Sequence, residues 1–160
     1  MYYGLTSLGV FHTLVSLVAI VTGAIALIRD KKITWDNGIG KIYIISTIIV
    51  CLTGFGIFQH GGFGKPHVLG IITLLTLAVA FMARNKSLGT KSVYIETISF
   101  SATFFFHIVP GITETATRLP LDAPLASSPE DPNIQMAIGI CFVLFLIGAF
   151  LQVKSLKKIQ

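Results

Sequence analysis

Four histidines, one near an end of each of four apolar segments, are the side chains of this chain best suited to metal chemistry. They are His12, His60, His67 and His107. Imidazole is the commonest metal ligand and titrates close to neutral pH. Ionisable groups inside a membrane are energetically costly and mark functional sites. The four rings can act together only if the segments that carry them meet at one depth.

The composition identifies those segments as membrane spans. Of the 160 residues, 53% are hydrophobic and only 12% are charged, and the mean hydropathy is +0.81. Soluble domains carry about 25% charged residues. We therefore expect an all-α integral membrane helical bundle that forms a single domain over residues 1–160.

Five apolar stretches are long enough to be transmembrane helices, since a span needs about 20 residues. The predicted spans are residues 8–28, 42–59, 66–83, 93–109 and 134–153. The fourth is expected to end before Pro110, because proline disfavours the helix interior. An outer loop over residues 110–133, rich in proline, then leads to the fifth span.

The distribution of lysine and arginine predicts the orientation. Ten of the 12 basic residues fall in the first and third connections and at the C-terminus, which share one side in a five-helix protein. The positive-inside rule places that side in the cytoplasm and the N-terminus outside, so the protein is expected in the bacterial plasma membrane. Because the spans alternate in direction, all four histidines are then predicted near the extracytoplasmic face.

A four-helix bundle that presents one imidazole per helix can hold a metal ion between its helices. The favoured hypothesis is a transition-metal centre of Zn, Cu or Fe with His12, His60, His67 and His107 as ligands. Glu114 could complete or orient such a site. A redox, respiratory or metal-handling role would follow.

Haem b is the alternative cofactor, and it would make the protein an electron-transfer subunit. Two histidines from opposite helices would bind the iron. Phe58 and Phe106 could line the faces of the haem ring, and Gly70 could make room for it. Arg118 could form an ion pair with a haem propionate. The segment 65–70 (KPHVLG) also resembles the short His-x-Leu-Gly pattern of transmembrane haem-b reductases of the ascorbate-oxidising kind. Haem would leave two histidines unused, which favours the metal ion.

Two further functions stay open at this point. A metal-dependent lipid hydrolase at the outer leaflet would use a metal-bound water as nucleophile and would need a lateral groove for an acyl chain. A non-catalytic transporter or assembly subunit is the other.

The lipid bilayer is the expected partner of this protein. A respiratory or redox partner and a homo-oligomer are left open. No nucleic-acid partner is expected, because the basic residues flank the spans.

Several local motifs together resemble an uncharacterised family of small prokaryotic multispanning membrane proteins, known as a domain of unknown function. The motifs are Phe11-His12, residues 40–43 (GKIY), Thr53-Gly54 and residues 63–67 (FGKPH), and the resemblance covers roughly residues 8–110. Family members often carry a histidine before the Gly-[Arg/Lys]-x-Tyr segment, where this chain has Trp35 and Asp36. The resemblance implies a helical membrane protein and supplies no reaction.

Overall fold

The protein is built from α-helices throughout the part of the chain that the structure describes. The structure is a computed structural model and describes residues 6–58 and 62–157. Those residues form five α-helices, one short 3₁₀ helix and no strand. In chain order the elements are α1 (Ser7–Arg29), α2 (Gly38–Gly54), α3 (Lys65–Arg84), η1 (Gly89–Lys91), α4 (Ser92–Arg118) and α5 (Pro132–Lys157).

The helices are apolar enough for a multi-pass membrane protein. Four of them are long and apolar enough to cross a bilayer, namely α1, α3, α5 and the stretch Gly89–Arg118 that contains α4. The fifth apolar helix, α2, has 17 residues. It begins four residues before the expected start, where the Asn37 side chain accepts a hydrogen bond from the Gly40 backbone N–H (2.8 Å), and it ends at Gly54 instead of residue 59.

The prediction that the fourth helix ends before Pro110 is wrong. Helix α4 continues through Pro110 to Arg118, so the outer connection is shorter than the expected loop of residues 110–133. A proline removes one backbone donor, and membrane helices tolerate this loss when the surrounding structure compensates. The last helical residue is Arg118, and the next residue, Leu119, precedes Pro120 and has an extended backbone. The residue before a proline is disfavoured in helical conformation, which explains this end point.

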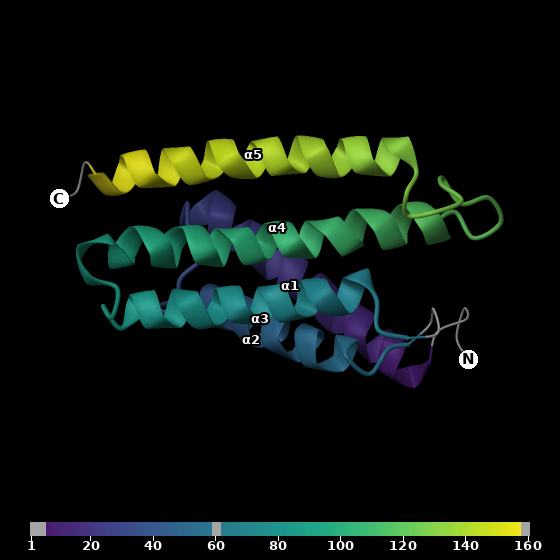
Figure 1. The fold of residues 1–160 in the computed structure, drawn as a ribbon, viewed down its shortest axis with the longest axis horizontal. Helices are drawn as coiled ribbons and strands as arrows, with labels where there is room; N and C mark the ends of the chain where they lie inside the picture. Colours follow the sequence, from purple (N-terminus) through teal and green to yellow (C-terminus); the bar gives the residue numbers. More distant parts are fainter. Residues whose placement is uncertain (1–5, 59–61, 158–160) are drawn as a thin grey trace.

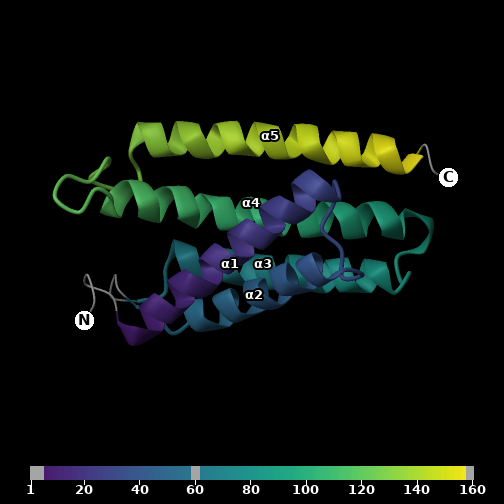
Figure 2. The same cartoon turned by 180° about the vertical axis from the view of Figure 1, so that it is seen from behind.

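The helices run alternately up and down the bundle (Figure 1). The start of α1, the end of α4 and the loop before α5 lie at one end of the molecule, and the C-terminus lies at the other. Helix α1 crosses α2, α3 and α4 obliquely on the face seen in Figure 2. The most extensive helix–helix contacts join α1 to α2, α3 to α4, and α4 to α5. The end that holds the α1–α2 and α3–α4 connections is called the basic end below, because it carries most of the lysines and arginines.

The packed centre lies among the first four helices. Tyr43 and Ile44 of α2 and Phe100 of α4 are fully buried there. Trp35, just before α2, packs edge-on against Phe81 of α3, which in turn packs edge-on against Phe100. Helix α5 is peripheral, since Ile134 is its only buried residue among those described.

An ion pair at the basic end links the α1–α2 connection to the end of α3. The guanidinium of Arg84 donates two hydrogen bonds to the Asp36 carboxylate (2.6 and 3.1 Å). These bonds, with a further one from the Thr34 hydroxyl, lower the pKa of the Asp36 carboxyl from 3.8 to about 2. The charged form of Asp36 is therefore favoured in the folded protein.

This shift predicts acid sensitivity in a defined range. Because the folded pKa of Asp36 lies below its unfolded value, its stabilising contribution is complete above about pH 4 and is lost as the pH falls towards 2. We expect the thermal unfolding midpoint in detergent to fall less steeply over this range in Asp36→Asn than in the wild type. Asp122→Asn, which removes a carboxylate outside this ion pair, should keep the wild-type slope. Equal slopes for all three proteins would contradict the prediction.

Candidate metal centre

Two of the predicted ligands, His12 and His107, are each held by a threonine hydroxyl of α2. The Nδ1 atom of His12 lies 3.0 Å from the Thr53 Oγ1. The Nε2 atom of His107 lies 3.0 Å from the Thr47 Oγ1. Helix α2 therefore positions one imidazole from α1 and one from α4.

The direction of these hydrogen bonds follows from what the hydroxyls do elsewhere. Thr53 Oγ1 lies 2.8 Å from the carbonyl of Ile49, and Thr47 Oγ1 lies 2.8 Å from the carbonyl of Tyr43. A carbonyl can only accept, and a hydroxyl has one proton. We therefore assign each hydroxyl proton to the carbonyl of its own helix, and the hydroxyl oxygen then accepts from the histidine ring.

This pattern assigns the neutral tautomer of both rings. His12 carries its proton on Nδ1 and keeps a lone pair on Nε2, whereas His107 carries its proton on Nε2 and keeps a lone pair on Nδ1. Metal-binding histidines usually donate their other N–H to a fixed acceptor, which sets the ring orientation. Both rings are thus in the state that a metal ligand requires.

The surroundings of His107 are polar although they lie inside the bundle. His107 is buried, and the Tyr43 ring packs edge-on against it at a centroid distance of 6.0 Å. The Tyr43 hydroxyl is 2.8 Å from the Thr103 hydroxyl, which donates to the Phe100 carbonyl (2.7 Å). The buried polar groups of α2 and α4 therefore satisfy one another around this histidine.

His12 stands in the same polar region as His107. Its ring interacts electrostatically with His107 and with Glu114, which places all three near the end of the bundle where α1 starts. Glu114 itself forms an ion pair with Arg118, one helical turn further along α4. The carboxylate expected at a metal and the guanidinium expected at a haem propionate thus contact each other.

His67 is held differently. Its Nδ1 accepts a hydrogen bond from the Gly64 backbone N–H (3.2 Å) at the start of α3. The ring is stacked between Phe58 (5.1 Å) and Phe63 (5.0 Å). Its Nε2 atom is buried and has no hydrogen-bond partner in the described part of the chain. Because Nδ1 accepts, the neutral ring carries its proton on Nε2 and its one lone pair is already engaged by the Gly64 N–H, which leaves none free for a metal ion.

The four-histidine set is not assembled by the described residues. His60 lies outside them. Within residues 6–58 and 62–157, no group of three or more histidine, cysteine, aspartate or glutamate side chains is placed to hold a metal ion. The structure therefore places His12 and His107 in one polar region and gives His67 a separate aromatic environment.

The residues proposed to receive haem are engaged with other parts of the protein. A Cβ atom added to Gly70 would lie 3.1 Å from the Phe55 ring, and one added to Gly54 would lie 3.3 Å from the His12 ring. Phe58 stacks on His67, and Phe106 contacts Phe105. Protein side chains thus occupy the space beside both glycines, and these residues do not fit a haem ring in this arrangement.

Sequence reasoning did not identify Thr47 and Thr53 as functional residues. Which way a helix is rotated decides whether a threonine meets a histidine, and composition does not reveal that rotation. Comparisons with protein-family models, with characterised proteins and with solved structures give no match, so the family resemblance stays a prediction.

Proposed function

We propose that this membrane protein binds a transition-metal ion between α1 and α4, with Nε2 of His12 and Nδ1 of His107 as the primary ligands. The observation that carries the proposal is the pair of ring-to-threonine hydrogen bonds, each of 3.0 Å. With the threonine protons assigned to the α2 carbonyls, one lone pair on each ring is available to a metal ion. Imidazole nitrogen suits Zn, Cu and Fe.

Two imidazoles leave coordination positions free. His60 and Glu114 are the further ligands expected from the sequence, and Glu114 already interacts electrostatically with His12. Water would fill any remaining position, as in sites that keep an open coordination position. A metal-handling or redox role near the outer face of a bacterial plasma membrane is the function that this arrangement favours, with the orientation given by the positive-inside rule.

Metal analysis of the purified protein tests the proposal. The detergent-solubilised protein should retain about one equivalent of a transition metal after dialysis, and His12→Gln and His107→Gln should each lose most of it, since each removes one of two primary ligands. His67→Gln is the matched control and should retain the metal, because the His67 ring stacks on Phe58 and Phe63 and its Nδ1 lone pair is engaged by the Gly64 N–H.

The alternatives predict other results. Loss of metal in His67→Gln as well would support the four-histidine centre. A Soret absorption band in the wild type would support haem b. Sub-stoichiometric metal in the wild type, or full retention in both His12→Gln and His107→Gln, would refute the proposal and leave the two rings as hydrogen-bonded core residues. Circular dichroism of each variant confirms that it is folded.

A further inference from the structure

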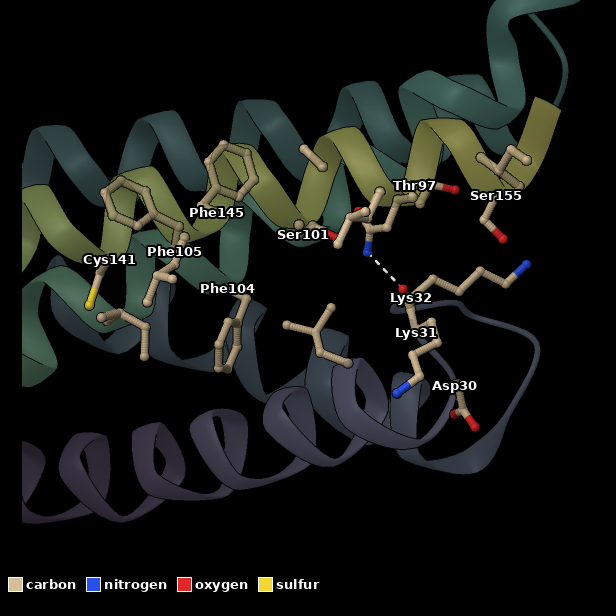
Figure 3. A pocket seen from close by; sticks show the side chains of 18 residues that line it. Asp30, Lys31, Lys32, Thr97, Ser101, Phe104, Phe105, Cys141, Phe145 and Ser155 are labelled. Atoms are coloured by element: carbon tan, nitrogen blue, oxygen red, sulfur yellow. Dashed lines mark hydrogen bonds between the residues drawn. The ribbon is translucent and has the colours of Figure 1, made fainter. Parts of the chain in front are cut away.

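A groove of about 760 Å³ runs along the surface between α4, α5 and the end of α1 (Figure 3). Its volume is within the range of about 300–1,000 Å³ that is typical of ligand sites. None of the described histidines lines it, so it is separate from the candidate metal centre. It has one apolar part and one polar end.

The apolar part is formed by side chains of α4 and α5. Phe104 and Phe105 come from α4, and Leu144 and Phe145 come from α5. Gly148 also lines the groove, and a Cβ atom added there would meet no other atom within 4 Å. The groove thus offers an open apolar channel on a helix pair that faces the bilayer.

The polar end lies at the basic end of the bundle. Lys31, Lys32 and Ser155 lie there, across from the phenylalanines in Figure 3. The carboxylate of Asp30, which also lines this end, is bound by Arg29 (2.7 and 2.8 Å) and by the Asn37 amide (3.0 Å). Arg29 therefore neutralises Asp30, and positive charge dominates this end of the groove.

Two other carboxylates lie within electrostatic range of Lys32, and one guanidinium offsets only one of their two charges. Asp36 and Glu96 both interact with Lys32. Both also form ion pairs with Arg84 (2.6 and 3.5 Å). Lys31 and Lys32 still outnumber the one uncompensated carboxylate, so this end keeps a net positive charge that can attract an anion from outside the protein.

Gln152 fixes the geometry of this end. Its amide nitrogen donates to the Lys31 carbonyl (2.9 Å, the dashed line in Figure 3), and its amide oxygen accepts from the Ser101 hydroxyl (3.0 Å). One side chain of α5 thereby joins the α1–α2 connection to α4. The backbone at Lys31 is thereby tied to the two helices that form the apolar channel.

We propose that this groove binds an anionic phospholipid. One acyl chain lies along Phe104, Phe105 and Phe145, and the phosphate lies near Lys32 and Ser155. We infer an anionic lipid because the groove joins an apolar channel to a cationic end. That end lies where a spanning helix would leave the bilayer, and basic residues at this depth attract anionic headgroups. A zwitterionic lipid would match the channel but would gain less from the lysines.

Native mass spectrometry of the full chain in detergent tests this. The probes are phosphatidylglycerol and phosphatidylcholine with identical acyl chains. We expect the wild type to retain phosphatidylglycerol preferentially, and an excess of inorganic phosphate to leave this retention largely intact. Lys32→Gln should reduce phosphatidylglycerol retention about fivefold, and Gly148→Leu should reduce it at least about tenfold by filling the channel.

Gly139→Leu is the matched control for the channel, because Gly139 is on the same helix, has equally open surroundings and does not line the groove. It should bind phosphatidylglycerol like the wild type. Equal retention by Gly148→Leu and Gly139→Leu, no preference over phosphatidylcholine, or full displacement by phosphate would each overturn the proposal.

A second measurement on the wild type does not depend on how the variants fold. Phosphatidylglycerol with a photoactivatable acyl chain should cross-link to residues 141–156 of α5 and to the neighbouring part of α4. Labelling spread evenly over the exposed faces of α1 and α3 would overturn the proposal.

Discussion

Replacing either Thr47 or Thr53 with valine is expected to weaken metal binding by about 10- to 100-fold. Valine keeps the shape of threonine but cannot accept the histidine N–H. The ring then loses the contact that fixes its orientation and tautomer. A competition titration against a chromophoric chelator, on protein dialysed free of metal, measures the change in affinity.

Thr73→Val is the matched control for this experiment. Thr73 is also buried, and its hydroxyl donates to the Leu69 carbonyl of its own helix (2.8 Å). The same chemical change should therefore leave the metal affinity unaltered there. A purely structural role for the threonines would lower the stability of all three variants by about 1 kcal/mol without separating their affinities, and that result would contradict the prediction.

Gly40→Ala is expected to destabilise the protein by about 3 kcal/mol. A Cβ atom at residue 40 would lie 1.9 Å from the Thr34 carbonyl oxygen, which is a backbone atom. The connection before α2 must move to make room, although Ile33 within it is buried and Trp35 packs against Phe81. The unfolding free energy in mixed micelles measures the effect.

Gly38→Ala separates this steric effect from the general effect of adding a methyl group to α2. A Cβ atom at Gly38 meets nothing within 4 Å, and alanine is a better helix former than glycine by about 1 kcal/mol. Gly38→Ala should therefore be neutral or slightly stabilising. Similar stability in the two variants would show that the connection yields easily at Thr34.

The membrane class and the helices could be predicted from the sequence because both depend on composition along short stretches. The runs around residues 8–28, 66–83 and 134–153 are continuous and apolar, and α1, α3 and α5 occupy nearly the same ranges. The concentration of lysine and arginine in alternate connections likewise predicted which of them share one end of the bundle.

Features that depend on three-dimensional context could not be predicted in this way. Pro110 signals a helix end, yet α4 continues through it to Arg118. His67 and His107 look equivalent in the sequence, but the first ring meets a backbone N–H and the second meets a hydroxyl. Both neutral rings then carry their proton on Nε2, but the Nδ1 lone pair of His67 is engaged and that of His107 is free. The difference arises because His67 sits in the first turn of its helix.

The length of α2 affects how the bilayer meets the histidines. At about 1.5 Å per residue, its 17 residues extend about 26 Å, whereas the hydrocarbon layer is about 30 Å thick. A bilayer around α2 must make up about 4 Å, by local thinning of the lipid or by polar groups reaching outward past Gly54. We therefore expect solvent to reach deeper beside Thr53 than around α1, which has 23 residues. A hydrated ion could approach His12 while keeping most of its water shell.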